Sequence, residues 1–176
     1  MLIWLIAGLV FLAFYSWFFL KDTKRQVVAG TTFSIFAFLA VLLLSLNMSQ
    51  HFGMEKTTTT TTKQVYSIMP AQSPVSAVAV KKIGSDNYVL VYKDAAADAQ
   101  TSTHFVPNTK KVVEAVKQRA TYQKGDVTTA EVHTKTVKWS YKSDFYKFLF
   151  KQKNEDNVVS VRHMLIVPNT WQVVEK

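Results

Sequence analysis

The first stretch of the chain, residues 1–20, is rich in apolar residues and carries no charge. As a helix it rises about 1.5 Å per residue and reaches about 30 Å, the thickness of a bilayer's hydrocarbon core. Trp4 near one end and Tyr15 and Trp17 near the other fit the aromatic belts of the two interfaces. A cleaved secretory signal is the alternative, but the stretch lacks a basic start, is too long and has no A-x-A-like site. We therefore expect a transmembrane helix over residues 1–20.

A second uncharged stretch covers residues 27–48, and only the six residues 21–26 separate it from the first. Six residues cannot recross a membrane, so the two stretches predict an antiparallel transmembrane hairpin. Its turn contains three cations, Lys21, Lys24 and Arg25. Short basic loops remain in the cytoplasm, which places the turn inside and both chain ends outside.

Small side chains recur along the second stretch at spacings of four and three, at Gly30, Ser34, Ala37 and Val41. Such a face lets another helix backbone approach closely. It either packs against small residues of the first stretch (Gly8, Ala13 and Ser16) or serves a different membrane protein. Neither stretch contains an Asp, Glu, Lys, Arg or His, which argues against a proton or ion path through the hairpin.

Residues 49–62 include six consecutive threonines, Thr57 to Thr62. A homopolymeric tract without an apolar pattern cannot bury itself, so we expect a Thr-rich tether; the alternative is that the tract opens the first strand of the following domain. Residues 63–176 then form a second domain. From residue 49 onward the chain has 19 valines and only 3 leucines, which favours strands and predicts a mainly-β domain.

Two local patterns in this domain predict strands. Residues 77–83 and 88–93 flank Gly84-Ser85-Asp86-Asn87, a hairpin with a four-residue connection. Residues 128–141 alternate between the two faces of a strand.

Two other segments are ambiguous. The valines of residues 112–122 fit a helix or a strand, and we favour a strand. Ser143-Asp144 fits the start of a short helix, but the internal repeat described below favours a strand from Tyr146. Tyr146, Phe148 and Phe150 would then share one face of that strand and fill the core. Outside the core, these aromatic residues would form an exposed patch typical of a partner surface.

The domain repeats itself. Residues 106–114 match residues 167–175 at seven of nine positions, including a shared Val-Pro-Asn-Thr motif, and residues 81–91 match 151–161 at a constant offset. We infer two β units, 63–114 and 136–175, each with a lead strand, a hairpin and a last strand. Two such units predict a small sandwich or a half-open barrel.

Composition separates the two regions. Apolar residues make up about 71% of residues 1–48 and about 40% of the rest, and residues 49–176 carry a net charge of +7. A basic surface attracts anionic lipids and polymers. Most of the lysines are interspersed with strand residues, as on a solvated face, and the nearest approach to patches gives five candidate anion contacts, Lys110, Lys111, Lys147, Lys151 and Lys153.

Chemistry is hard to find in the sequence. The chain has no cysteine, and its four histidines, His51, His104, His133 and His163, show no metal-binding spacing. No nucleophile elbow, phosphate loop or nucleic-acid-binding motif is present. We therefore expect no enzyme activity, no cofactor, no bound metal and no nucleic-acid partner.

The two-span hairpin with its Lys21–Arg25 turn, the Thr-rich segment and the Val/Lys-rich β region with its Val-Pro-Asn-Thr motifs resemble an uncharacterised family of small membrane proteins from lactic-acid bacteria, defined as a domain of unknown function. The resemblance implies a Gram-positive plasma membrane with the domain facing the wall, and it brings no site residues. We expect a membrane-anchored, non-enzymatic accessory protein for a membrane transporter or complex, through a membrane-protein partner or self-association. The alternative is an envelope-binding module for anionic wall polymer or lipid.

Overall fold

The computed structural model describes residues 1–107, 110, 112–151 and 157–175. The chain divides into two compact units. The first comprises Met1–Lys56 and Trp139–Asn157, and the second comprises Thr57–Lys138 and Val158–Lys176. Residues 139–157, which we expected inside the β-domain, thus group with the two N-terminal helices.

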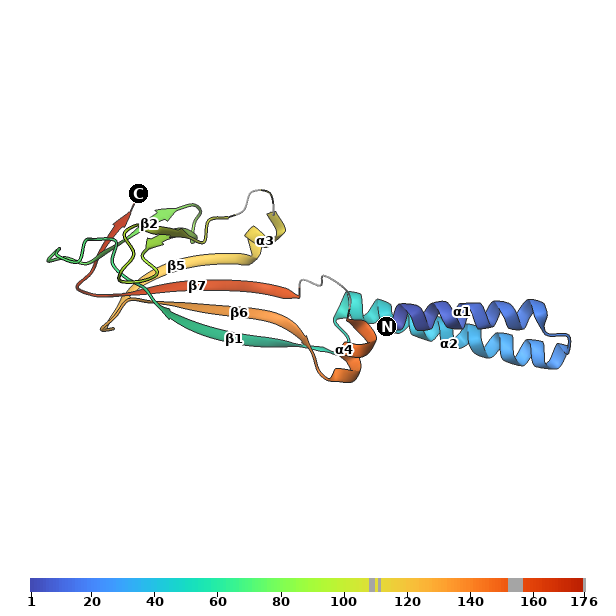
Figure 1. Ribbon diagram of the computed structural model, residues 1–176. Helices are drawn as coiled ribbons and strands as arrows, with labels where there is room; N and C mark the ends of the chain where they lie inside the picture. Colours follow the sequence, from blue (N-terminus) through green and yellow to red (C-terminus); the bar gives the residue numbers. More distant parts are fainter. Residues whose placement is uncertain (108–109, 111, 152–156, 176) are drawn as a thin grey trace. The chain divides into compact units, whose positions relative to one another are not determined.

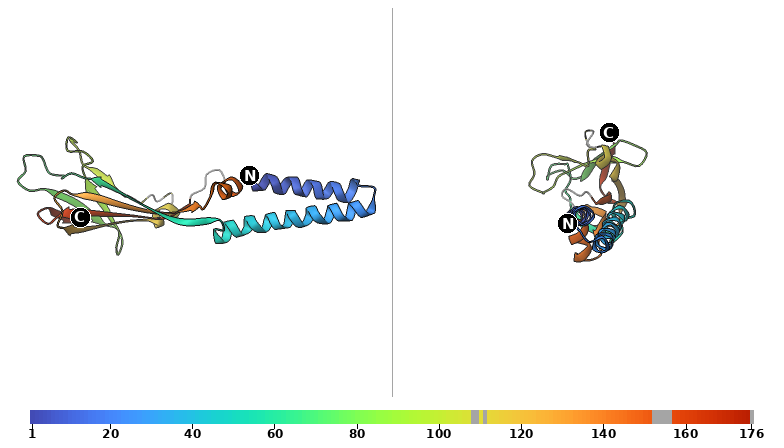
Figure 2. Two further views of the ribbon diagram at one scale, coloured as in Figure 1. Left: turned by 90° about the horizontal axis from the view of Figure 1, so that it is seen from below. Right: turned by 90° about the vertical axis from the view of Figure 1, so that its right-hand side faces the viewer.

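The first unit contains α1 (Leu2–Phe19), α2 (Thr23–Gln50) and α4 (Asp144–Phe150). Figures 1 and 2 show α1 and α2 side by side and antiparallel, joined by a short turn. Both helices are long and apolar enough to cross a membrane. The prediction of two long apolar helices is therefore confirmed.

Both ends of α2 follow from local chemistry. At the start, the side chain of Asp22 accepts a hydrogen bond from the backbone N–H of Lys24 at 3.0 Å, which satisfies one of the open donors of the first turn. At the end, His51 adopts a left-handed conformation (φ 55°) and Asn47 donates its side-chain N–H to the carbonyl of Phe52 at 2.7 Å. These contacts turn the chain out of the helix.

The strands form two mixed four-stranded sheets (Figure 1). The first has the order β1-β6-β7-β5, with β5 parallel to β7 and β6 antiparallel to it. The second has the order β4-β3-β2-β8, with β8 parallel to β2 and the other pairs antiparallel. The bounds are β1 (Met54–Gln64), β2 (Ala77–Lys82), β3 (Tyr88–Tyr92), β4 (Ser102–His104), β5 (Gln118–Gly125), β6 (Glu131–Tyr141), β7 (Val158–Pro168) and β8 (Gln172–Glu175).

The core of the second unit lies between the two sheets. Val78 and Leu90 come from one sheet, Val132 and Leu165 come from the other, and all four belong to one buried cluster. The predicted hairpin over residues 77–93 is confirmed as β2 and β3, which pair from Ala79–Val91 to Lys82–Tyr88. A mainly-β domain is therefore confirmed, with two mixed sheets.

The strand predicted from Tyr146 is wrong, because residues 144–150 form the helix α4. Ser143 caps it by accepting a hydrogen bond from the backbone N–H of Tyr146 at 3.4 Å. Helical spacing then places Tyr146 and Phe150 on one side, where both pack in the first unit, and leaves Phe148 exposed. The local capping signal was right, and the comparison between the two copies misled the prediction.

Two further segments differ from the favoured prediction. Residues 112–122 contain both alternatives, a short helix α3 (Val112–Lys117) followed directly by β5. The six threonines lie within β1, which pairs with β6 and opens the sheet instead of serving as a free tether. Cβ branching favours this extended backbone, and the strand at the sheet edge needs to bury few of these side chains.

The two predicted repeat units do not have matching secondary structure. The first arm of the predicted second hairpin is α4, whereas its counterpart in the first unit of the repeat is β2. The segment after the second Val-Pro-Asn-Thr motif is β8, whereas residues 112–117 after the first are α3. Asn108, Thr109 and Lys111 lie outside the described residues. The duplication remains a prediction from the sequence.

Candidate functional site

The contact between α1 and α2 uses one side of each helix. Buried and half-buried residues alternate at spacings of three and four, at Leu2, Ile6, Leu9, Ala13 and Ser16 on α1 and at Gly30, Phe33, Ala37, Ala40, Leu44 and Asn47 on α2. This seven-residue pattern is typical of helices that wrap around each other with a small left-handed twist. A Cβ built on Gly30 would lie 2.7 Å from the indole of Trp17, so that contact requires glycine.

The predicted small-residue face is therefore divided. Gly30 and Ala37 are buried in the hairpin, whereas Ser34 and Val41 are exposed. The first alternative of the sequence analysis, packing against α1, holds for Ala13 and Ser16, but Gly8 has nothing within 4 Å of a built Cβ.

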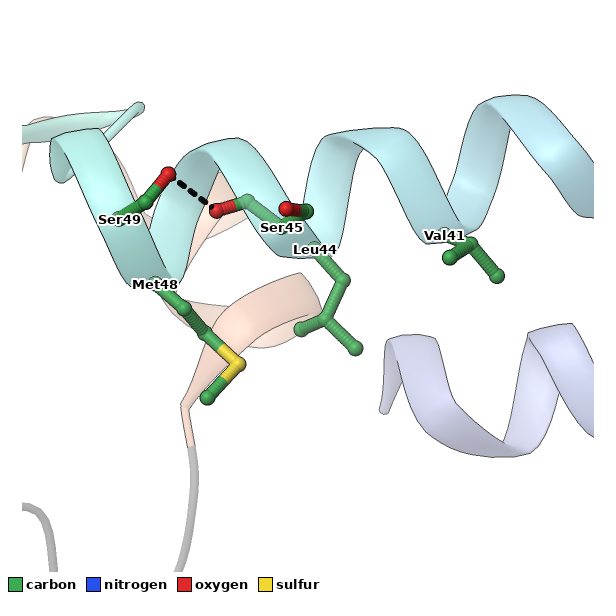
Figure 3. Close-up of a pocket in the computed structure, with 5 residues that line it drawn as sticks. All are labelled: Val41, Leu44, Ser45, Met48 and Ser49. Atoms are coloured by element: carbon green, nitrogen blue, oxygen red, sulfur yellow. Dashed lines mark hydrogen bonds between the residues drawn. The ribbon is translucent and has the colours of Figure 1, made fainter.

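The exposed side next to this contact forms what we name the outer face of α2, defined by Ser34, Phe38, Val41, Ser45 and Met48. Toward the end of the helix it contains a groove of about 430 Å³ lined by Val41, Leu44, Ser45, Met48 and Ser49. Figure 3 shows the three apolar side chains projecting from one side of α2, and the Ser49 hydroxyl donating to the carbonyl of Ser45 at 2.7 Å. The groove is apolar with hydroxyl-bearing small residues beside it.

The three cations of the turn, Lys21, Lys24 and Arg25, are all exposed. Arg25 lies 3.6 Å from the carboxylate of Asp22. The pair is exposed and therefore adds little stability, and the turn keeps a net positive charge.

The candidate anion contacts are divided between the units. Lys147 and Lys151 lie in and directly after α4 of the first unit, where they line a hollow of about 420 Å³ with Met1, Asp144 and Phe148. Lys110 is exposed in the second unit. Lys111 and Lys153 lie outside the described residues. The structure thus brings together two of the five predicted lysines.

A stronger group of cations lies on the first sheet of the second unit. Arg119 of β5 is the register partner of Arg162 of β7, and Arg162 is the register partner of Lys135 of β6. All three are exposed, and their neighbours Ala120 and His163 point into the core instead. We name these three residues the cationic row. Within the described part of the chain, none of the three side chains makes an ion pair with a carboxylate.

A cleft of about 360 Å³ adjoins the cationic row and is lined by Val116, Lys117, Arg119, Val159, Ser160, Val161 and Arg162. Among the described residues, the lining contains three cations and a hydroxyl but no carboxylate. Like charges on neighbouring positions of paired strands are destabilising. An anion in the cleft would relieve this repulsion.

Sequence reasoning missed this row because it depends on strand register. Arg119, Lys135 and Arg162 are far apart in the sequence, and only the pairing of β5, β7 and β6 aligns them. Alternation in each strand could indicate that these cations share the face opposite the buried Val132, Ala120 and Leu165, but it does not give their alignment.

Four rings form a second cluster inside the second unit. Tyr92 stacks on His104 with ring centroids 3.9 Å apart, and Phe105 stacks on His163 at 3.7 Å. Phe105 adopts a positive φ of 62°, which is rare for a bulky residue, and its ring also lies 5.9 Å from that of His104. His104 and His163, which showed no shared spacing in the sequence, are thus joined through Phe105.

The electrostatics of this cluster favour uncharged imidazoles. Burial lowers the pKa of His163 to about 4, and its Nδ1 lies 2.9 Å from the Thr134 hydroxyl. Burial also lowers the pKa of His104, although Asp94 lies 3.3 Å away and opposes the shift. A hydrogen bond from Lys63 lowers the pKa of Asp94. Among the described residues, no group of three or more His, Asp or Glu side chains is arranged to hold a metal ion.

The fold defines a class: a chain with two long apolar helices followed by a mainly-β unit of two mixed sheets. A family model described as Domain of unknown function (DUF4811) matches residues 22–176. The chain belongs to this family, and the match includes α2 and both sheets but not α1. No curated protein and no solved structure matches the chain.

Proposed function

We propose that this protein is a two-pass plasma-membrane protein that acts as a non-enzymatic accessory or interaction protein. In this proposal α1 and α2 span the membrane, the turn with Lys21, Lys24 and Arg25 faces the cytoplasm, and both chain ends and the second unit lie outside the cell. The length and apolar composition of the two helices support the spans, and the cations of the turn support the orientation.

The partner surface is the outer face of α2. Its groove at Val41 and Ser45 is the single observation that carries the proposal, because it is an open hollow beside small side chains on a side of α2 that α1 leaves exposed. Close packing against small residues drives helix association in lipid, where the hydrophobic effect between helices is absent. The occupant is a transmembrane helix of another membrane protein, in keeping with a role beside a transporter or complex.

Photo-crosslinking at native expression tests this surface. A benzoylphenylalanine at Val41 or Ser45 should give a discrete cross-linked product with another membrane protein, whereas the same probe at Leu39, which is exposed on a different side of α2, should not. Filling the groove with Val41→Phe should abolish co-purification of that protein in gentle detergent, and Leu39→Phe should leave it intact. Equal cross-linking from both sides, a product of two copies of this chain, or recovery of this protein alone would refute the assignment.

The cationic row favours a second function, binding of an anionic envelope polymer by the second unit. Arg119, Arg162 and Lys135 place three charges side by side with a cleft at one end. Phosphate groups accept paired hydrogen bonds from arginine, so a polymer that repeats phosphate would fit the row.

Binding of inorganic polyphosphate to the full chain in a zwitterionic detergent tests the second function. At low salt the affinity should fall about tenfold or more in Arg119→Gln/Arg162→Gln, since each lost charged hydrogen bond is worth about 1.5–3 kcal/mol. Lys81→Gln/Lys82→Gln removes the same charge from exposed positions of β2 and should cost less. High salt should weaken all binding. An equal loss of affinity in the two variants would show that binding depends only on net charge, and it would refute a binding site at the cationic row.

A further inference from the structure

The helix α4 has a wide apolar arc, only part of which is covered. At about 100° per residue, Tyr146, Leu149 and Phe150 fall on one arc, Phe145 and Phe148 on the next, and Lys147 and Lys151 on the remaining side with Asp144. The first arc is packed within the first unit, whereas Phe145 is 64% and Phe148 62% exposed. Exposing two phenylalanines to water is unfavourable, so their exposure beside two lysines on a short helix indicates a contact surface.

The covered arc attaches α4 to the ends of the long helices. Phe150 and Leu149 belong to one cluster with Leu2 and Ile6 of α1 and with Leu44 of α2. The Leu2 end of α1 and the Leu44 end of α2 are at the same end of the hairpin because the two helices are antiparallel.

The chain leaving α2 holds the other side of α4. A Cβ built on Gly53 would lie 2.7 Å from the ring of Tyr146, and Gly53 has a positive φ of 80°. Phe52 meets Tyr146 edge to face at 5.9 Å, and the carbonyl of Gly53 accepts the backbone N–H of Lys142 at 3.0 Å. The helix is therefore held at the level where α1 begins and α2 ends.

We propose that α4 is an interfacial helix that seats in the outer leaflet, with Phe145 and Phe148 in the boundary between headgroups and acyl chains and with Lys147 and Lys151 on the phosphates of anionic lipid. This inference rests on the proposed membrane spans of α1 and α2. Amphipathic helices with aromatic residues on one side and lysines on the other occupy this depth in bilayers.

Two observations make lipid, not a protein, the occupant. The exposed aromatic residues belong to a helix that packs against the end of the hairpin where Ile3, Leu5 and Leu42 are also exposed. The hollow of about 420 Å³ beside Phe148 is lined by both lysines, whose charge exceeds that of the one carboxylate present, Asp144. An apolar rim next to a net positive hollow complements an anionic phospholipid: the rim would contact the acyl chains, and the lysines would contact the phosphate.

Spin labels on single cysteines test the depth of α4. The chain has no native cysteine, so each introduced one is unique. Full-length protein with Phe145→Cys or Phe148→Cys is labelled and reconstituted in vesicles of phosphatidylcholine and phosphatidylglycerol. Collisions with oxygen, which enriches in the bilayer, are compared with those of a water-soluble nickel chelate. Phe38→Cys of α2 reports the membrane interior, and Val113→Cys, 71% exposed on α3, is the control in the second unit.

We expect the labels at 145 and 148 to collide several-fold less with nickel than the label at 113, and to lie shallower than the label at 38. Nickel access at 145 and 148 equal to that at 113, with a deep label at 38, would overturn the interfacial helix while leaving the membrane spans standing. Nickel access at 38 would instead overturn the spans themselves.

Charge reversal tests the lipid contact separately. The depth of the label at residue 148 is compared between vesicles with and without phosphatidylglycerol. Lys147→Glu/Lys151→Glu should reduce the difference in depth between the two vesicle types, whereas the control Lys81→Glu/Lys82→Glu on β2 should preserve it. Should wild-type depth be the same in both vesicle types, the assignment of the lysines to anionic phosphate is overturned.

Discussion

In the first unit the contact between α1 and α2 includes small or polar side chains such as Ser16, Gly30 and Ala37 beside its leucines, and the helices leave Trp4 79% and Phe11 68% exposed. The second unit does the reverse: its largest fully buried side chains include Leu90 and Leu165, and its exposed sheet face carries the cationic row. The two units share one chain but follow opposite rules of burial.

The difference supports the proposal that the two units face two solvents. In water a helix hides its large apolar residues, whereas in lipid those residues face the solvent and small residues let backbones approach. The exposed Trp4 and Phe11 of α1 satisfy the second rule, and the alternation of buried Ala120 and exposed Arg119 on β5 satisfies the first.

The largest contrast is expected from truncating one apolar side chain in each unit. Leu165→Ala should destabilise the second unit by about 2–5 kcal/mol, because Leu165 is fully buried between the sheets. Phe11→Ala removes more atoms from α1 but should have almost no effect in lipid-like detergent. Urea unfolding of the full chain in mild detergent measures both. Comparable losses in the two variants would contradict the division into two solvents.

A pH titration of stability tests the buried imidazole of His163. The pKa of His163 falls from about 6.5 in the unfolded chain to about 4 in the folded one, so only the unfolded chain binds a proton between these values. Stability should be full above pH 6.5 and decline by up to about 3 kcal/mol as the pH falls to 4. His163→Gln should flatten this slope, even if it lowers stability throughout. An unchanged slope would mean that His163 is not the titrating group.

The smallest of the three effects compares two glycines of the hairpin. Gly30→Ala places a methyl group against Trp17 and should cost about 1–3 kcal/mol through overpacking. Gly8→Ala is the matched control, because a built Cβ there has nothing within 4 Å. Thermal loss of helical circular dichroism in detergent measures both. Equal melting temperatures for the two variants would mean that Trp17 does not pack over Gly30.

The sequence predicted the elements whose cause is local. The uncharged stretches predicted both long helices, and the Gly84-to-Asn87 turn predicted the β2–β3 hairpin, because length and turn chemistry are properties of neighbouring residues. The error at α4 has the opposite origin: the Ser143 cap is a local signal, but similarity to the first copy was given more weight.

The surfaces were harder to predict because they depend on register and packing. The small-residue face was found, but which of its members meet α1 depends on the helix contact, which buries Gly30 and Ala37 and exposes Ser34 and Val41. The cationic row requires Arg119, Arg162 and Lys135 to align across three strands, and nothing in the order of residues gives that alignment.

Labelling with a membrane-impermeant maleimide tests the central claim, that the first unit lies in lipid and the second in water outside the cell. The cells are stripped of their wall and carry a single cysteine at Val116, Thr23 or Phe38. We expect Val116→Cys, on the exposed α3, to react in intact cells, Thr23→Cys, at the turn, to react only after the membrane is permeabilised, and Phe38→Cys to react only after denaturation. Reaction of Phe38→Cys in intact cells, or protection of Val116→Cys, would contradict the claim.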